Sequence, residues 1–466
     1  MLTALFVYLA LQLGIGAYLS RRIRSEGDYL LAGRSLGYGL LTFSIFATWF
    51  GAETIIGSAG IVYNEGVSVA SAEPFGYGLC LVLMGLIFAV PLWRRKLTTL
   101  ADLFQQRFSP RVERVAALIL IPSSILWAAA QIRAFGQVVS IASGTLDVNV
   151  GITIAAGFVV LYTAFGGLLA DAITDVIQSV ILILGIFVVA FAAITQAGGV
   201  SAIASALGDP TRVHLLPPDA SWLHVVEAWA IPICGSVIAT ELVGRVIAAR
   251  SPTIARRSSM FGGALYIVVG LVPVLLGLIG ARLVPNLADP EQLLPVLAQQ
   301  HLPVALQAVF LGGLVSAILS TVDSTLLVSS GLLSHNLLVP ALRVTNERTK
   351  VRLARGGVLV FGVMAYVLAI HATGVFALVE QASAFGSAGA LVPVCFGLFT
   401  NFGGARAAMA TLVAGVGSYI GAVVIGAETP FLVSLASAVG AYVLVGLTER
   451  RADLPEPTPF EALPAD

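Results

Sequence analysis

Charged residues are scarce in this sequence of 466 residues. Asp, Glu, Lys and Arg make up only 11% of the chain, and hydrophobic residues make up 58%, whereas a soluble domain carries roughly 25% charged residues. This scarcity excludes an ordinary water-soluble domain and predicts that lipid is the solvent. Apolar runs of about twenty residues recur along the chain, and each is long enough to cross a hydrocarbon core of about 30 Å.

Catalytic and metal-binding patterns are also missing from the sequence. The three cysteines, Cys80, Cys234 and Cys395, lie in separate apolar runs without metal-ligand or disulfide spacing, so we expect small buried side chains there. No Gly-x-x-x-x-Gly-Lys-Ser/Thr phosphate loop is present, and no cluster of histidine and cysteine suggests a catalytic metal. We therefore expect neither an enzyme nor an ATP-driven pump, and no organic cofactor.

Hydropathy predicts an all-α polytopic membrane protein with about thirteen transmembrane helices. The predicted spans lie at 2–20, 37–62, 69–92, 114–142, 149–164, 171–195, 224–248, 259–284, 304–335, 353–371, 374–399, 405–425 and 430–447. Because they leave no room for a soluble domain, we predict one transmembrane domain over 1–447. The remaining residues, 448–466, are proline-rich and acidic, which is typical of a short disordered tail.

Basic residues alternate between the two sides of the predicted membrane. The connections after odd-numbered spans contain Arg21, Arg22, Arg24, Arg34, Arg94, Arg95, Lys96, Arg256, Arg257, Arg343 and Arg406, among others, whereas Arg212 and Arg282 fall on the other side. By the positive-inside rule, this predicts an external N-terminus and a cytoplasmic C-terminus. We expect an integral protein of the plasma membrane, namely a bacterial inner membrane.

The chain contains 48 glycines and 21 prolines, which membrane helices tolerate at close contacts and beside cavities. Spans two to eleven divide into two sets of five, about 37–195 and 224–399, and an odd number of spans inverts the second set. Inverted repeats of this kind place a binding site at the midplane, between interrupted helices. Interruptions are predicted at corresponding places, by Gly51, Gly57 and Gly60 in span two and by Pro232 and Gly235 in span seven.

Span nine presents a row of hydroxyl groups. At 100° per residue, Ala317, Ser320, Thr321 and Ser324 share one helix face, and hard oxygen ligands of this kind suit a small dehydrated cation. The alternative is that these serines and threonines bond carbonyls of their own helix or hold helices together. The spacing alone leaves both interpretations open.

Acidic residues within spans are costly in lipid and indicate functional positions. They are Glu53, Glu73, Asp175, Glu241 and Asp323, while Asp171 is expected to be solvated at the cytoplasmic mouth.

Trp49, Tyr77 and Trp127 lie in three spans that could meet around a central cavity. Aromatic faces of this kind can hold a cationic amine, although packing or interfacial aromatics are the alternative.

Four ordered motifs resemble the sodium:solute symporter family. They are Asp28-Tyr29-Leu30-Leu31-Ala32-Gly33-Arg34-Ser35-Leu36-Gly37, Gly166-Gly167-Leu168 with Thr174-Asp175-Val176-Ile177-Gln178, Arg245-Val246-Ile247-Ala248-Ala249-Arg250-Ser251 with Ala255-Arg256-Arg257, and Ala317-x-x-Ser320-Thr321-x-Asp323-Ser324. The resemblance implies a LeuT-like fold, an inverted five-helix repeat with one extra helix before it and two after it.

The same resemblance implies a set of sodium ligands. These are the carbonyls of Ala47 and Phe50 in the first core helix, the carbonyl of Ala317, and the hydroxyls of Ser320 and Thr321. By resemblance, Asp175 serves sodium coupling or a second ion.

Within the family, Ala47-Thr48-Trp49, Tyr77-Gly78, Asp102-Leu103-Phe104-Gln105-Gln106 and Trp127-Ala128-Ala129-Ala130 look most like high-affinity choline transporters. Trp49, Tyr77 and Trp127 then match positions of an aromatic cage. Ala239 stands where that group has a further tryptophan, so the cage is open. With Glu53 and Glu241 near it, the cage is expected to suit another amine or a zwitterion.

The resemblance implies sodium-coupled import of a small organic solute by alternating access. The expected partners are the solute, sodium ions and the lipid bilayer, with no nucleic acid. Two alternatives stay open: a proton-coupled symporter of the same fold, with Glu53 or Asp175 as the titrating group, and a sensor that binds solute without transporting it.

Overall fold

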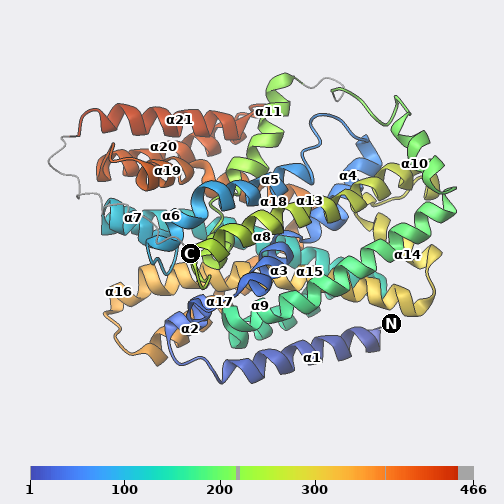
Figure 1. Ribbon diagram of the computed structural model, residues 1–466, viewed down its shortest axis with the longest axis horizontal. Helices are drawn as coiled ribbons and strands as arrows, with labels where there is room; N and C mark the ends of the chain where they lie inside the picture. The colour runs from blue at the N-terminus through green and yellow to red at the C-terminus, as the bar shows by residue number, and fades with distance from the viewer. Residues whose placement is uncertain (1, 217–220, 373, 450–466) are drawn as a thin grey trace.

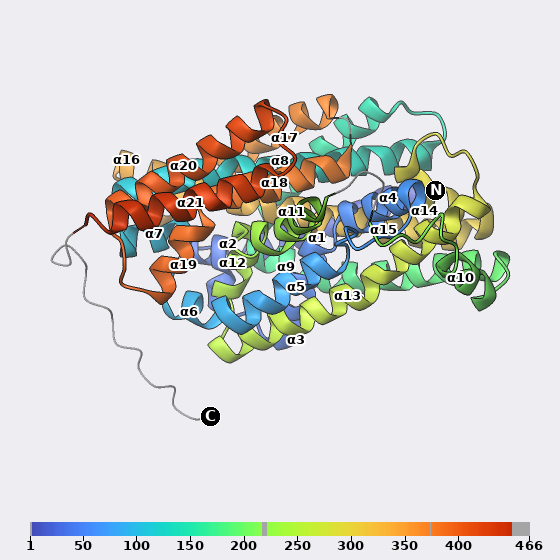
Figure 2. The same cartoon turned by 90° about the horizontal axis from the view of Figure 1, so that it is seen from above.

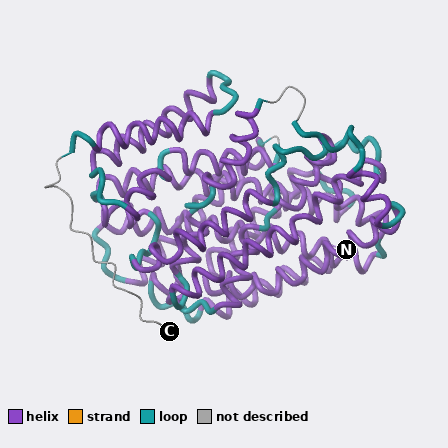
Figure 3. The backbone as a smooth tube through the Cα atoms, turned by 45° about the horizontal axis from the view of Figure 1, so that its top comes forward, coloured by secondary structure: helices purple, strands orange, loops and turns teal. Residues whose placement is uncertain are grey.

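The computed structural model describes residues 2–216, 221–372 and 374–449, and within these ranges all regular elements are helices. The helices lie side by side in a bundle, and most loops gather at its two ends (Figure 3). From residue 450 onward, the predicted tail lies outside the described residues. Glu449, just before that point, accepts hydrogen bonds from the backbone N–H groups of Gly404 (2.5 Å) and Arg406 (2.8 Å).

The first half of the chain forms the N-terminal helix and the first set of predicted spans. Its helices are α1 (Leu2–Ser20), α2 (Glu26–Leu31), α3 (Tyr38–Trp49), α4 (Ser58–Glu65), α5 (Phe75–Leu83), α6 (Ala89–Arg94), α7 (Ala101–Arg107), α8 (Pro110–Ser143), α9 (Val148–Gln196) and α10 (Val200–Leu207). A short 3-10 turn, Ala32–Arg34, follows α2, and π-helical turns at Glu53–Gly57 and Met84–Phe88 continue into α4 and α6.

The second half forms the remaining spans. Its helices are α11 (Trp222–Ala230), α12 (Thr240–Ile247), α13 (Pro252–Leu283), α14 (Leu293–His301), α15 (Val304–Gly331), α16 (Val339–Leu342), α17 (Glu347–His371), α18 (Val375–Ala388), α19 (Leu391–Phe399), α20 (Ala405–Val424) and α21 (Pro430–Gly446). π-helical turns at Ile231–Gly235 and Leu332–Leu338 extend α11 and α15, and a 3-10 turn, Pro290–Gln292, precedes α14.

The extra helices lie at the edges of the bundle and the core helices lie between them. Figure 1 shows α1 along one edge and α20 and α21 along the opposite edge, with α3, α8 and α15 between. In the perpendicular view, α8, α17 and α18 lie on one side, whereas α3, α5 and α13 lie on the other (Figure 2). Helix α15 packs along both α8 and α9, so its polar face is enclosed by protein.

The expected number of spans is confirmed once the breaks are taken into account. In the described residues, eight helices are long and apolar enough to cross a membrane, and ten spans result if each of two bent helix pairs is one span. Helix α9 contains two of the expected spans, and α1 and α21 supply the remaining two.

Helix α9 is a hairpin of two helices joined at Gly167. The Tyr162 hydroxyl lies 3.0 Å from Thr174 Oγ1, although these residues would be about 18 Å apart along one straight helix. Gly167 makes the reversal with φ 67° and ψ 173°, a conformation that is essentially restricted to glycine. The presence of a glycine at this place in the second of the four family motifs is therefore explained by the backbone.

Two core spans are broken where the sequence predicted interruptions. Helix α3 ends at Trp49, and the chain resumes as a helix at Glu53 with its axis turned by 54°. The span that begins with α11 is interrupted between Gly235 and Thr240. A third bend, of 47°, separates α18 from α19.

Two of the longest helices begin with the same local sequence. Ser109 and Ser251 cap α8 and α13, and their side chains accept hydrogen bonds from the backbone N–H groups of Val112 (3.3 Å) and Ile254 (3.2 Å). Each serine is followed by a proline, which lacks the N–H that would otherwise be unsatisfied in the first turn. The sequence Ser-Pro thus fixes where both helices start.

The Gly167→Ala variant is expected to destabilise the fold. A Cβ at this position would lie 3.0 Å from the Tyr29 ring, and the backbone strain alone costs about 1–3 kcal/mol. We expect thermal unfolding of the purified protein in detergent to occur at a temperature lower by a few degrees. Gly157→Ala is the matched control, because a Cβ added to Gly157, also on α9, would find no neighbouring atom within 4 Å. Equal unfolding temperatures for the two variants would contradict the assignment of a strained turn.

Candidate functional site

The hydroxyl face of α15 is buried and meets two other core helices. Thr321 Oγ1 donates to the Thr48 carbonyl of α3 at 3.0 Å, and Ser320 donates to the Asp175 carboxylate of α9. Ser324 Oγ lies 3.4 Å from Thr48 Oγ1. Thr321 and Ser324 also contact carbonyls of their own helix. These are the contacts of the second interpretation, in which the hydroxyls bond carbonyls of their own helix and hold helices together, and the hydroxyl row joins α15 to α3 and α9. The cation site stays a prediction.

Opposite this face, the end of α3 exposes backbone carbonyls. Phe50 leaves the helical conformation, with φ −88° and ψ 66°, and the Ala52 N–H donates to Gln131 Oε1 at 2.9 Å instead of continuing the helix. The last carbonyls of a helix have no partner within it. The carbonyls of Ala47 and Phe50, which the family resemblance implied as ligands, thus belong to a helix end that faces α15.

A fully buried arginine lies next to the hydroxyl row. Arg245 Nη2 is 2.7 Å from Asp171 Oδ2 and 3.4 Å from Asp175 Oδ2. Its Nε donates to Ser44 Oγ at 3.0 Å, and Ser44 donates to Asp175 at 2.6 Å. The expectation of a solvated Asp171 is wrong, because this residue is only 4% exposed and pairs with the guanidinium.

The buried carboxylates around Arg245 outnumber its single guanidinium group. Asp323 of α15 is 3% exposed and accepts a hydrogen bond from Thr163 of α9, so three buried aspartates lie in this region with one guanidinium. An excess of buried negative charge favours a bound cation or proton. No group of three His, Cys, Asp or Glu side chains that could hold a metal ion occurs in the described part of the chain. Backbone and hydroxyl oxygens are the other available ligands.

Sequence reasoning placed Arg245 in a family motif but gave it no role. The sequence feature that could have indicated a role is the charge of this residue within the apolar stretch Leu242–Ile247, because an unpaired guanidinium is costly in lipid. Helical periodicity could not identify its partners, because Asp171 and Asp175 are more than 65 residues away along the chain.

The structure brings the three predicted aromatic residues together. The rings of Trp49 and Trp127 have centroids 5.7 Å apart, and those of Tyr77 and Trp127 are 6.2 Å apart. All three side chains are buried, and we call Trp49, Tyr77 and Trp127 the aromatic cage. Tyr266, which the sequence did not single out, adds a fourth ring with its centroid 6.5 Å from that of Tyr77.

The predicted carboxylates belong to two separate polar networks. Glu53 accepts a hydrogen bond from Gln131 Nε2 at 2.7 Å, on the helix that carries Trp127. Glu241 accepts one from Ser124 at 2.5 Å, on the same helix but on the other side of Trp127 in sequence. Glu73, to which the sequence gave no specific role, accepts a bond from the Tyr266 hydroxyl at 2.9 Å. The aromatic cage therefore has carboxylates beside it on both sides.

A cavity of about 840 Å³ leads from one end of the bundle to the aromatic cage. We call it the vestibule; its lining includes Ser58, Glu65, Glu73, Tyr77, Leu126, His224, Glu227, Phe376, Glu380, Phe385, Tyr419 and Glu428. Five glutamates line it, and no lysine or arginine does so among the described residues. The vestibule thus offers an approach to the cage that is lined with carboxyl groups.

The elements at the opposite end of the bundle are tied together by polar contacts. His335 Nδ1 lies 3.1 Å from Glu26 of α2, and its Nε2 lies 3.4 Å from Asp102 of α7. Asn336 donates to Asp102 at 2.7 Å and to Glu113 of α8 at 2.8 Å. Burial opposes ionisation of Asp102, yet the hydrogen bond and charge of His335 and the backbone N–H groups of the Thr98–Thr99 turn hold its pKa below the ordinary value. A charged network therefore joins four helices where the vestibule does not reach.

Comparison with known proteins gives a consistent picture. The model of the sodium:solute symporter family matches residues 29–415. High affinity choline transporter 1 of Homo sapiens is 28% identical over 405 residues, which cover 81% of this chain and 69% of the relative. The osmoregulated proline transporter OpuE of Bacillus subtilis is 27% identical over 384 residues, which cover 79% of this chain and 77% of the relative. The match spans only 63% of the corresponding choline transporter of Drosophila melanogaster.

A solved structure shows the same fold. A sodium-coupled sialic acid symporter in a substrate-bound outward-open state aligns with a TM-score of 0.83, covering 96% of this chain and 98% of that chain at 19% identity. At this identity the likeness establishes the fold alone. The LeuT-like arrangement expected from the sequence is thereby confirmed.

Arg245→Met is expected to destabilise the protein strongly. Removing the guanidinium leaves Asp171 and Asp175 buried without their cation, and breaking a buried pair in this way costs about 3–5 kcal/mol. Adding Asp171→Asn to this variant should restore part of the loss, as measured by the thermal unfolding temperature in detergent.

Arg282→Met is the matched control for this experiment. Arg282 forms an ion pair at 3.4 Å with Asp209, but its side chain is 48% exposed, so its removal should change stability by about 1 kcal/mol or less. Equal effects of the two substitutions would show that Arg245 does not hold the buried carboxylates.

Proposed function

The chain belongs to the sodium:solute symporter family, and from this premise we propose that it imports a small amine or zwitterion together with sodium. The protein is a sodium-coupled secondary transporter that works by alternating access, and not an enzyme. The single observation that carries the solute assignment is the aromatic cage at the end of an acidic vestibule. The choline and proline transporters among its relatives support the same class of solute.

Sodium is proposed to bind between the end of α3 and the hydroxyl face of α15. Its ligands are the carbonyls of Ala47, Phe50 and Ala317 and the hydroxyls of Ser320 and Thr321. Ser320 supports this arrangement because its proton is donated to Asp175, so that lone pairs on its oxygen are available to a cation. Asp175 thus acts as a coupling residue that orients a ligand.

We propose that sodium binding is coupled to the opening of the vestibule. Because the proposed ligands come from two helices, bound sodium stabilises the state in which α3 and α15 are close and the vestibule is open. A ligand shifts such an equilibrium only by its difference in affinity for the two states. A negative-inside membrane potential adds about 2.3 kcal/mol per 100 mV for each charge that moves inward.

The solute is proposed to bind in the aromatic cage, with Glu53 and Glu241 beside it. Aromatic faces attract a quaternary or protonated amine by about 0.5–2 kcal/mol per contact. The five vestibule glutamates raise the local concentration of cations, because a cleft lined by one sign of charge attracts the opposite sign. An anionic solute would meet repulsion along the same path.

We place the protein in the plasma membrane, a bacterial inner membrane, with the vestibule facing outward, the N-terminus outside and the C-terminus in the cytoplasm. The alternation of arginine-rich connections supports this orientation. The network of Glu26, Asp102 and His335 then closes the cytoplasmic end.

Ser320→Ala and Thr321→Ala are each expected to raise the sodium concentration for half-maximal uptake about tenfold, corresponding to about 1.4 kcal/mol. Each substitution removes one oxygen ligand of the cation. Uptake is measured in proteoliposomes with an imposed sodium gradient. Ser329→Ala is the control, because Ser329 lies on the same helix and bonds the carbonyls of Thr325 and Leu326.

Unchanged sodium activation in both variants would overturn the sodium site. Uptake driven by a pH gradient without sodium would instead favour the proton-coupled alternative, with Glu53 or Asp175 as the titrating group. Binding without counterflow of labelled solute would favour a sensor.

A thermal-shift screen identifies the solute class. We expect amines or zwitterions to raise the unfolding temperature in sodium but not in potassium buffer, whereas sugars and simple carboxylates should not do so, since only ligands of the folded state stabilise it. Trp127→Leu should weaken the shift about three- to thirtyfold in ligand concentration, from the loss of one cation–π contact. Trp222→Leu is the control because Trp222 is 59% exposed. Stabilisation by anions alone would contradict the proposal.

A further inference from the structure

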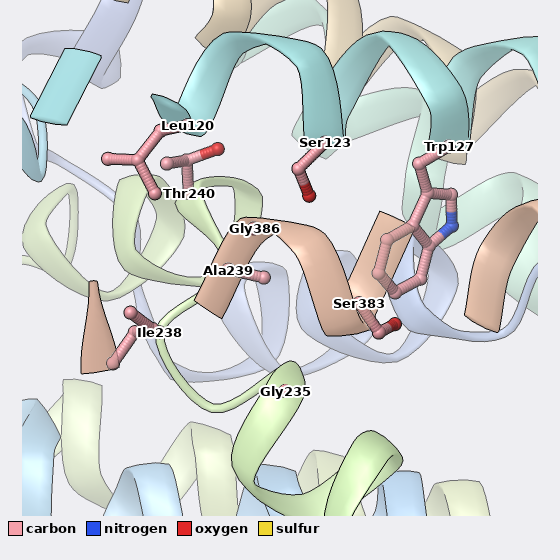
Figure 4. A pocket seen from close by; sticks show the side chains of 9 residues that line it. All are labelled: Leu120, Ser123, Trp127, Gly235, Ile238, Ala239, Thr240, Ser383 and Gly386. Atoms are coloured by element: carbon pink, nitrogen blue, oxygen red, sulfur yellow. The ribbon is translucent and has the colours of Figure 1, made fainter. Parts of the chain in front are cut away.

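A second cavity, much smaller than the vestibule, lies on the other side of the aromatic cage. Its volume is about 10 Å³, which is about the space that one water molecule needs. Figure 4 shows it between α8, α18 and the break that precedes α12. Tyr77 and Leu126 line the vestibule, whereas Trp127 and Ser123 line the small cavity. The cage therefore separates the two spaces.

The walls of the small cavity carry three hydroxyl groups, those of Ser123, Thr240 and Ser383. Ser123 donates to the Ala382 carbonyl at 2.7 Å, and Ser383 Oγ accepts from Ser236 at 3.1 Å. Since Ser123 has already donated its proton within the protein, what it presents to the cavity is an oxygen lone pair. A ligand group that enters the cavity should therefore bring a hydrogen-bond donor.

The carboxylate of Glu241 is linked to the lining of the small cavity through Ser124 and Thr240. Thr240 Oγ1 lies 3.1 Å from Ser124 Oγ, which donates to Glu241 at 2.5 Å. No lysine or arginine is among the described residues that line the cavity. A negatively charged group on the ligand would thus meet acceptor oxygens and a nearby carboxylate, with no cation to pair with.

Glycine keeps the cavity open at its far wall. Gly386 lies on α18, and a Cβ at this position would collide with Ser123 Oγ. The space therefore depends on a residue without a side chain.

We propose that the small cavity binds the hydroxyl group of an amino alcohol whose cationic end is held by the aromatic cage. This inference rests on the proposed function and narrows its solute class. A hydroxyl matches the cavity in size and supplies the donor, whereas a carboxylate is larger and carries the wrong charge. The cavity thus selects amino alcohols over zwitterions, and a bound hydroxyl replaces a water with equivalent hydrogen bonds.

The test compares four probes that share one cationic end. Tetramethylammonium has no tail, choline carries a hydroxyl, ethyltrimethylammonium has a hydrogen in place of that hydroxyl, and glycine betaine carries a carboxylate. Binding to the purified full-length protein in lipid nanodiscs with sodium is measured by calorimetric titration. We expect choline to bind at least tenfold more tightly than ethyltrimethylammonium, and glycine betaine to bind most weakly.

Substitutions in the wall localise the preference. Thr240→Val keeps the shape of the side chain but removes its hydroxyl, so the preference for choline over ethyltrimethylammonium should fall to within about twofold while tetramethylammonium binding changes little. Thr240→Ser keeps a hydroxyl at this position and should therefore retain the preference for choline. Ser123→Ala provides the same comparison if Thr240→Val does not fold.

The possible outcomes separate this inference from the proposed function. Equal binding of choline and ethyltrimethylammonium, or tighter binding of glycine betaine, would overturn the hydroxyl site but leave the cage intact. A preference that survives in both Thr240→Val and Ser123→Ala would also overturn it. Failure of all four probes to bind would instead reject the cage and the proposed amine solute.

Discussion

The pairing of Arg245 with Asp171 and Asp175 is the constraint on which the other features of the core depend. A guanidinium that is fully buried in a membrane protein requires carboxylates at hydrogen-bond distance, and it finds them on α9 at 2.7 and 3.4 Å. Ser44 of α3 and Ser324 of α15 bond the same group. Four helices are thereby fixed relative to one another, including the half-helix α12 that follows a break. The cluster also sets the direction of the Ser320 hydroxyl, which donates to Asp175.

Helix α3 connects the ion region to the solute region. Its last turn carries Thr48, whose carbonyl accepts from Thr321, and Trp49, whose ring lies against Trp127. Adjacent residues on one broken helix thus face the proposed sodium site and the aromatic cage. A displacement of this turn must alter both regions together. Energetic coupling between the two proposed sites therefore needs no long pathway in this protein, because one backbone segment contacts both regions.

In the proposed function, the two cavities contribute to recognition of the solute in different ways. The vestibule is large and acidic, so it acts on charge at a distance and tolerates many shapes. The small cavity is the size of one water molecule and acts by hydrogen-bond geometry. The aromatic cage lies between them and is proposed to hold the cationic end of the solute.

The sequence by itself determined that the chain lies in lipid, and it determined the number of spans, the breaks near Gly51 and Gly235 and the hydroxyl face of α15. These follow from hydropathy, helical period and backbone freedom, which act over a few residues. Only the tertiary structure decided that Asp171 pairs with Arg245 and that Tyr266 joins the aromatic cage. It also produced the cavity beside Ser123 and Gly386. These features arise between helices that are distant in sequence, and side-chain contacts across such distances are set by packing rather than by local pattern.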